Sequence, residues 1–354
     1  MADVLCVMTF DPDDTAPPTV DRSWWRRLRD RVAGIGWPLR FRRAAGAKLP
    51  VKRSRWHWTW RIALVLLVLY YPVGALIVED IDDDAQFAPR DVAAGESRAV
   101  AVAAELVSRE VDVHQWTPMQ PFFMPAAILD NMPNFQRGLL AALGRFSTEM
   151  MDQLGRTRGS SQVDRDLEQA RGFLNEQPNI WIWQPSVSFL PTATSAQKYR
   201  AGRDKLIAYN KRMAAGQAVF ERRADNLQGL LDRIANDIGS DSAVIDQHIV
   251  ERAGDLFDLQ CDDIFYFNKG RLYANYLLLR ELGSDFQNVI KERDLANAWN
   301  GMVETFRYAA GLHPLIVWNG YPDGLLVPNH LAAQGFYLLR ARTQLREISS
   351  ILQK

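Results

Sequence analysis

Cysteine and histidine are scarce in this sequence, which has two Cys and five His among its 354 residues. Two cysteines cannot build the disulfide framework of a small secreted fold, and no Cys-x-x-Cys or His-Glu-x-x-His spacing for a zinc site occurs. Glycine-rich phosphate loops and the Gly-x-Ser-x-Gly element of hydrolases are absent as well. Because no catalytic signature is present, we expect no cofactor, and we favour a protein that is not an enzyme while leaving the question open.

Net charge is also absent, since 42 Lys and Arg balance 42 Asp and Glu. The balance is uneven along the chain: residues 1–61 hold 13 basic against six acidic residues, or +7, and the remaining residues carry −7. An uncharged run at 62–78 separates the two parts. With its Trp-rich entry this run predicts a transmembrane helix over 56–78, which at about 34 Å is long enough to span a bilayer.

The charges on either side of this helix predict its orientation. Basic residues stay on the cytoplasmic side, so we expect the N-terminus inside and the acidic remainder outside. A cleaved signal peptide would have a short basic start, whereas here 61 residues rich in Arg precede the run, and no small-x-small cleavage pattern follows it. We therefore expect an uncleaved anchor. Cys6 and Cys261 would then lie on opposite sides of the membrane and could not pair.

Residues 1–55 form a basic leader that we expect to be partly disordered, with an amphipathic helix near 22–33. Trp25, Leu28 and Val32 fall on one face of that helix. Because a span lies close by, we favour membrane lipid over nucleic acid as the partner of this segment. The expected membrane-surface residues are Trp24, Trp25, Arg26, Arg27, Arg29 and Arg31.

Residues 79–95, which follow the span, are predicted to be an acidic linker. Four of their carboxylates also match positions 1, 3, 5 and 12 of a calcium-binding loop: Asp80, Asp82, Asp84 and Asp91. Position 6 is Ala85 rather than the glycine that the sharp turn needs, and Pro89 interrupts the loop. We favour acids that mark the outer end of the span, and keep a calcium site as the alternative.

Helical periodicity dominates residues 96–354, and repeated strand–helix units are absent, so the predicted fold is mainly α: one N-terminal transmembrane helix and an all-helical outer domain. Residues 313–328, with their Asn-Gly and Asp-Gly pairs, predict either one small β-hairpin or an ordered loop. The expected helices cover 97–113, 134–154 with an Asn134 cap, 163–174, 243–259, 270–282, 286–311, and a last helix capped by Asn329.

One further helix is predicted to be unusually long. It begins at Thr194, which forms a capping-box pair with Gln197, and apolar residues then recur every seven positions. This pattern predicts about 44 residues of continuous helix. Its seam either packs inside its own domain, which we favour, or forms a surface for a partner through Leu206, Met213, Phe220 and Leu227.

Two polar segments are the candidate ligand-binding residues: Asp130, Asn131 and Asn134 in the first, and His313, Asn319, Asp323, Asn329 and His330 in the second. If the two segments fold against each other, they form a polar pocket. Asn and Asp also cap helices and build turns, and we favour this local role for them.

Four stretches carry a resemblance to a known family: VLYYPVGALIVEDIDDDAQF at 68–87, PMQPFFMPAAILDNMPNFQRG at 118–138, FNKGRLYANYLLLREL at 267–282 and VPNHLAAQGFYLLRARTQL at 327–345. The sequence resembles a proteobacterial inner-membrane family known only as a domain of unknown function, numbered twenty-three thirty-three. The resemblance implies an inner-membrane location and a periplasmic outer domain at 96–354. It brings no reaction and no catalytic residues.

Two hypotheses of function follow. In the first, the periplasmic domain is an interaction or scaffold module whose partner is another envelope protein or a second copy of the chain. In the second, the chain is a membrane-anchored periplasmic enzyme or ligand-binding protein that uses the 130–134 and 313–330 loops. The heptad pattern and the missing catalytic signatures favour the first.

Overall fold

The computed structural model describes residues 55–154, 163–183, 185, 189–255 and 258–354, with side chains from residue 58 onward. The chain divides into two units, Met1–His57 and Trp58–Lys354, and the description below concerns the second. The predicted membrane-surface residues of the leader and its amphipathic helix at 22–33 lie outside the described residues.

Helix α2 (Arg55–Val78) contains the predicted span. Over Trp58–Val78 it is long and apolar enough to cross a membrane. Its side chains face outward along most of this length, as at Leu66 and Val68, both more than 60% exposed. A helix of this kind is not part of the core of its own domain, because burying such side chains is what stabilises a core.

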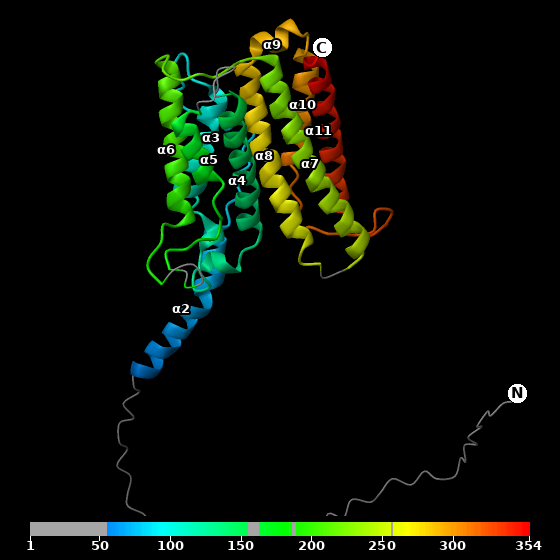
Figure 1. Ribbon diagram of the computed structural model, residues 1–354. Helices are drawn as coiled ribbons and strands as arrows, with labels where there is room; N and C mark the ends of the chain where they lie inside the picture. Colours follow the sequence, from blue (N-terminus) through cyan, green and yellow to red (C-terminus); the bar gives the residue numbers. More distant parts are fainter. Residues whose placement is uncertain (1–54, 155–162, 184, 186–188, 256–257) are drawn as a thin grey trace, which may run out of the picture. The chain divides into compact units, whose positions relative to one another are not determined.

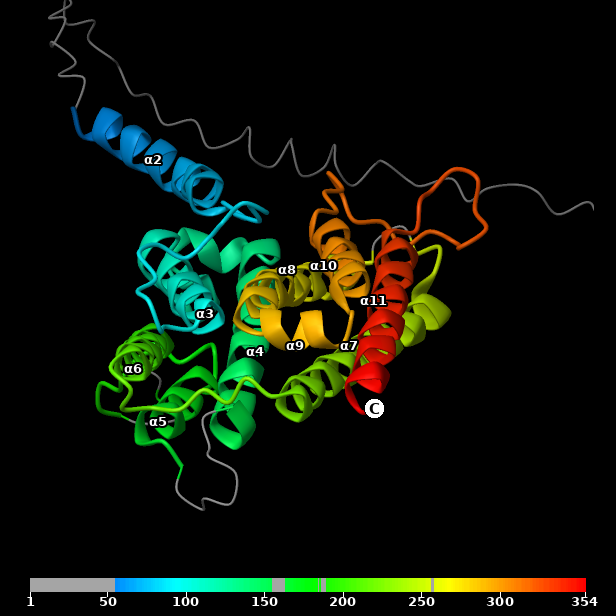
Figure 2. The same ribbon diagram turned by 90° about the horizontal axis from the view of Figure 1, so that it is seen from above.

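The rest of the described chain is helical, as the sequence predicts. Its α-helices are α3 (Arg98–Ser108), α4 (Asn131–Glu149), α5 (Arg165–Leu174), α6 (Ser195–Ala214), α7 (Ala224–Arg252), α8 (Cys261–Asp285), α9 (Gln287–Glu292), α10 (Ala296–Ala310) and α11 (His330–Leu352). Within the described residues there is no strand, and of the two structures predicted for residues 313–328, a small hairpin or an ordered loop, the chain forms the loop, with one isolated bridge between Asn319 and Asn329. Figures 1 and 2 show α4 beside α8, α7 beside α11, and α5 beside α6.

Two glycines let α4 and α8 approach closely at the centre of the domain. A Cβ added to Gly138 would clash with the Phe267 carbonyl, and one added to Gly270 would clash with the Phe135 carbonyl. The two contacts are reciprocal, so each backbone lies against the other helix where only glycine leaves room. This pair of helices is the packing axis around which the other helices are arranged.

The prediction of one helix of about 44 residues is wrong. The Thr194–Gln197 capping box is present, but the helix ends at Ala214, Gly216 turns the chain at φ +72°, and a new helix begins at Ala224. The seven-residue spacing spans the break because Phe220, in the connection, folds inward and packs on Phe286 at 5.8 Å between ring centroids. The repeat therefore records burial rather than helical continuity.

The same result removes the proposed partner surface. Leu206, Met213, Phe220 and Leu227 are each no more than 8% exposed and belong to the core of the domain. A partner could not reach these side chains without unfolding the domain. These four side chains pack inside their own domain, which is the alternative that the sequence analysis favoured.

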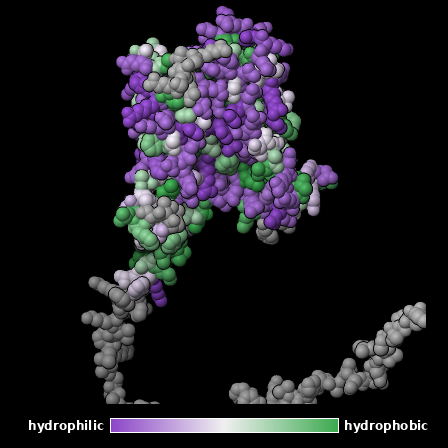
Figure 3. Space-filling view, in the orientation of Figure 1, coloured by the Kyte–Doolittle hydropathy of each residue, from purple (hydrophilic) through white to green (hydrophobic). Residues whose placement is uncertain are grey.

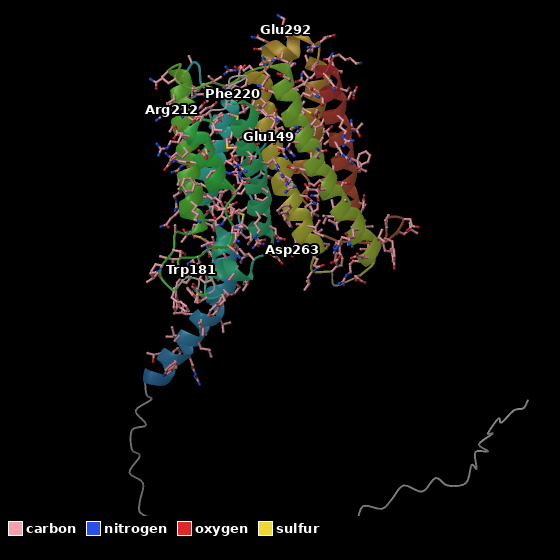
Figure 4. All side chains as sticks on the ribbon, viewed as in Figure 1. Glu149, Trp181, Arg212, Phe220, Asp263 and Glu292 are labelled. Carbon is pink, nitrogen blue, oxygen red and sulfur yellow. The ribbon has the colours of Figure 1, made fainter. Side chains whose placement is uncertain are left out.

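The bundle has two distinct ends. Figure 4 places Asp263 and Trp181 at one end, and Arg212, Phe220 and Glu292 toward the other. We call the first the proximal end, because the 121–125 segment located there contacts α2 through Tyr71 and Gly74, and the second the distal end.

Local caps explain where several helices begin. At the proximal end Asp130, rather than the expected Asn134, caps α4, and Pro133 lies within the first turn, where its missing amide costs nothing. Asn329 caps α11 as predicted, accepting a hydrogen bond from the Ala332 amide at 2.7 Å.

Candidate functional site

The acidic segment 79–95, which follows α2, is docked on the helical domain through ion pairs. The Asp82 carboxylate lies 3.2 Å from the Arg109 guanidinium, and the Asp83 carboxylate lies 2.6 Å from Lys269 Nζ. Both cations are almost completely buried. The segment predicted as a linker is therefore held against α3 and α8, because a buried cation is stable only when a carboxylate or other acceptors compensate for lost water.

Backbone contacts continue this docking along the segment. The hydroxyls of Tyr273 and Tyr276 donate to the carbonyls of Asp84 and Ala85 at 2.9 and 3.0 Å. Arg280 donates to the Ala85 carbonyl at 2.9 Å and also to that of Phe87. Because α8 supplies all three side chains, a single helix fixes the path of the chain as it leaves α2.

Arg109 also belongs to a second, fully buried network. A π-helical turn, Arg109–Val113, follows α3 and directs Arg109 and Glu110 into the domain. The Glu110 carboxylate accepts from Arg109 Nε at 3.0 Å and from Gln136 Nε2 at 3.2 Å. Burial raises the pKa of Glu110, and the Arg109 guanidinium acts against that rise. Tyr273 accepts from Arg109 Nη1 at 2.9 Å and so links this network to the docked segment.

Lys269 connects the docked segment to the second predicted polar loop. Its ammonium donates to the carbonyls of Ala310 and Leu312 at 2.8 and 2.7 Å, in addition to its pairing with Asp83. Burial lowers the pKa of Lys269, and the Asp83 carboxylate acts against this. His313 Nε2 lies 3.0 Å from the same Asp83 carboxylate. The loop after α10 thus begins at the place where the segment after α2 is held.

The 313–330 loop is closed mainly by its own polar side chains. Asn329 donates to Asn319 Oδ1 at 3.1 Å, and the Trp318 amide donates to His330 Nδ1 at 2.9 Å. Asn319 also donates to Asp258 at 3.0 Å. Burial alone would raise the pKa of Asp258, but hydrogen bonds from Asn319 and His248 hold it below its usual value. Asp323 is exposed at the tip of the loop.

The first predicted segment meets the beginning of α8 instead. The side chain of Asn134 donates to Asp263, while Asp130 and Asn131 lie at the start of α4. Carboxylate oxygens of Asp130, Asp262 and Asp263 lie within 4.8 Å of one another, so this group could hold a divalent cation, which prefers oxygen ligands. Burial and the charge of Asp130 raise the pKa of both Asp262 and Asp263.

The two predicted segments line separate cavities. Asp130 and Asn134 border one of about 380 Å³, and Asn319 borders another of about 310 Å³ beside Gly254 and Leu325. Asp130 and Asn329 cap helices, the local role that the sequence favoured, whereas Asn134, His313 and Asn319 contact residues far away in the chain.

The four acids of the alternative calcium loop are also dispersed. Among the described residues, no three of Asp80, Asp82, Asp84 and Asp91 lie close enough to share one ion. Asp82 pairs with Arg109, and Asp91 borders a different cavity, of about 320 Å³, between α3 and α6.

Sequence reasoning missed Arg109, Lys269 and Tyr273, which hold the acidic segment, and Glu110, which pairs with Arg109. A signal for one of them was present: Lys269 follows Phe265 and precedes Leu272, Tyr273 and Tyr276 at helical spacing, so the cation falls on an otherwise apolar face. A charge in that position indicates a buried partner.

Comparison with known proteins finds a family match over part of the chain and no function. Residues 119–257 match the model of DUF2333, described as an uncharacterized protein conserved in bacteria. The match extends from the loop before α4 to just beyond α7 and confirms the resemblance over those residues. No curated protein and no solved structure matches the chain.

Proposed function

We propose that this chain is a single-pass inner-membrane protein whose helical domain lies in the periplasm and acts as an interaction or scaffold module. The observation that carries the proposal is the docking of residues 79–95, directly after α2, onto the buried cations Arg109 and Lys269. A domain tied to its span in this way holds a fixed position at the membrane surface. Fixed position is what a scaffold needs.

The polarity of the chain supports the orientation. The segment before α2 is basic and the segment after it is acidic, and basic segments stay in the cytoplasm. Reporter fusions test this placement. We expect alkaline phosphatase fused after Lys354 to be active in intact cells and a fluorescent protein that folds only in the cytoplasm to be dark. The opposite pair of results would overturn the periplasmic placement.

The partner is expected to be another envelope protein or a second copy of the chain, and its surface must differ from the buried heptad residues. Phe336 and Leu339 are apolar, lie on α11 and are 60% and 49% exposed. A photo-crosslinking amino acid at Phe336 of the full chain, irradiated in cells, is expected to give a cross-linked product of higher mass. The same probe at Glu168, an exposed position on α5, is the control. No product is expected at Glu168, and absence of products at both Phe336 and Leu339 would argue against a scaffold.

The alternative, a membrane-anchored enzyme or ligand-binding protein, retains one supporting observation: the three carboxylates of Asp130, Asp262 and Asp263 within 4.8 Å. The variants Asp130→Ala, His313→Ala and His330→Ala separate the two functions. If a variant that folds normally loses its cellular function while its cross-links persist, the result supports the ligand-binding role and contradicts the scaffold role.

A further inference from the structure

Large apolar side chains are exposed at the proximal end of the bundle. Phe122 is 85% exposed, and Leu325 and Leu326, in the 313–330 loop, are 100% and 96% exposed. These residues come from segments nearly 200 positions apart, yet Figure 1 shows both segments at the end where α8 begins. On the face of the bundle that Figure 3 shows, the surface is mostly hydrophilic, and hydrophobic surface gathers over α2 and at this end. Exposed apolar surface of this kind does not stabilise a domain in water, and it marks a site where a protein, a ligand or a membrane binds.

Contacts with α2 place one of these segments alongside the span. The Tyr71 hydroxyl donates to the Phe122 carbonyl at 3.0 Å, and a Cβ added at Gly74 would lie 2.5 Å from Pro125 Cγ. Tyr71 lies seven residues before Val78, the end of α2. At 1.5 Å per residue, the Phe122 backbone lies beside a point about 10 Å inside the end of the helix.

We propose that the exposed apolar residues of the proximal end, among them Phe122, Ile128, Leu315, Leu325 and Leu326, enter the outer leaflet of the membrane that α2 crosses, so that the domain rests on the bilayer by its proximal end. This inference depends on the proposed membrane span. Its occupant is the lipid surface itself, because the 121–128 segment is continuous with α2 through Tyr71 and Gly74. Any bilayer deep enough to cover Leu76 and Ile77 also reaches Phe122.

The charges at this end predict the kind of lipid contact. Asp130, Asp262 and Asp263 lie together at this end and Asp323 is exposed in the 313–330 loop, so the inferred contact does not depend on attraction to anionic headgroups. Binding would come from apolar burial, as for aromatic and aliphatic residues at a membrane interface, and would not require negatively charged lipid.

Depth-dependent quenching tests the inference on the full chain. The protein, carrying Cys6→Ser, is reconstituted in phosphatidylcholine vesicles, and Cys261 stays unlabelled because it is 2% exposed. An environment-sensitive fluorophore is attached at Leu325→Cys, at Phe122→Cys or, as the distal control, at Glu292→Cys. With brominated acyl chains we expect quenching at least threefold stronger at residues 122 and 325 than at 292, together with a blue-shifted emission. Equal quenching at all three positions would overturn the inference.

A second measurement separates failure of this inference from failure of the span. Extraction of the same membranes with alkaline carbonate should leave the chain in the membrane fraction. If the chain is released, the span itself is wrong. If the chain is retained while position 325 is unquenched, the span stands and the lipid contact is wrong. Protein cross-links from residue 325 without quenching would assign the surface to a protein partner instead and would equally overturn the inference.

Discussion

The two ends of the helical bundle differ in what they bury and what they expose. At the proximal end Lys269 and Arg109 are buried with carboxylates of the acidic segment, while Phe122, Leu325 and other apolar side chains are exposed. At the distal end the end of α9 exposes Lys291 and Glu292, whereas Phe220 and Phe286 turn inward and pack together. Both ends bury some charged groups, but the distal end keeps these aromatic side chains inside, as a protein in water does, whereas the proximal end exposes several large apolar side chains.

The exposed apolar side chains at the proximal end indicate where an apolar phase takes the place of water. Exposed Leu and Phe stabilise a structure only if another apolar phase covers them, and buried charges are stable only when they are paired or hydrogen-bonded, as Arg109 and Lys269 are with Asp82 and Asp83. Both conditions are met if the proximal end faces the membrane. In that case the ion pairs fix the domain to the end of its span, and the loops contact lipid.

The largest expected effect comes from Lys269→Met. Removal of the ammonium leaves the Asp83 carboxylate with a much weaker set of partners in a buried position, which costs about 3–5 kcal/mol of the free energy of unfolding. The measurement is urea unfolding of the full chain in detergent, followed by circular dichroism. Lys291→Met, at an exposed position toward the distal end, is the control and should change stability by less than about 0.5 kcal/mol. Equal effects of the two variants would remove the proposed difference between the ends.

A smaller loss is expected from Gly270→Ala, which tests the axis that both ends share. The added Cβ meets the Phe135 carbonyl and must push α4 and α8 apart, at a cost of about 1–3 kcal/mol. Gly172→Ala is the matched control, because no atom lies within 4 Å of the added Cβ, and alanine there should be neutral or slightly stabilising. Thermal unfolding distinguishes them. If Gly270→Ala left the unfolding temperature unchanged, α4 and α8 would not be in close backbone contact at this position.

The sequence sufficed for the features that depend on local pattern. Apolar length and flanking charge predict α2, and helical periodicity predicts the helical class, because each signal is contained within one segment. The break at Gly216 was not predictable from the repeat, since Phe220 keeps the spacing by packing on Phe286 from outside a helix. A residue buried from a connection and a residue on a helix face therefore both fit the seven-residue spacing of apolar residues.

The candidate site depended on pairings that sequence does not contain. Asp82 and Asp83 are recognisable as acids, but their partners Arg109 and Lys269 lie far along the chain and are reached only after α3 and α8 have packed. The Asn329 and Thr194 caps were accessible because each acts within its own turn, although the cap of α4 is Asp130 and not the expected Asn134. Residues that act across the fold were not identified.

The smallest expected effect concerns pH and the 313–330 loop. His330 Nδ1 accepts the Trp318 amide hydrogen, which requires an unprotonated nitrogen, and burial lowers the pKa of His330 below 6.5. Between the folded pKa and 6.5 the unfolded chain binds more protons than the folded one. This contribution to stability is therefore present above pH 6.5 and lost as pH falls through the folded value. Hydrogen exchange at Trp318, corrected for the intrinsic rate, should accelerate severalfold between pH 7.5 and 5.5. His330→Asn supplies an oxygen that can accept the same hydrogen bond but does not titrate, so its exchange should not depend on pH. An equal acceleration in this variant would assign the effect to another group, and the exposed loop would then owe its closure to Asn319 and Asn329 alone.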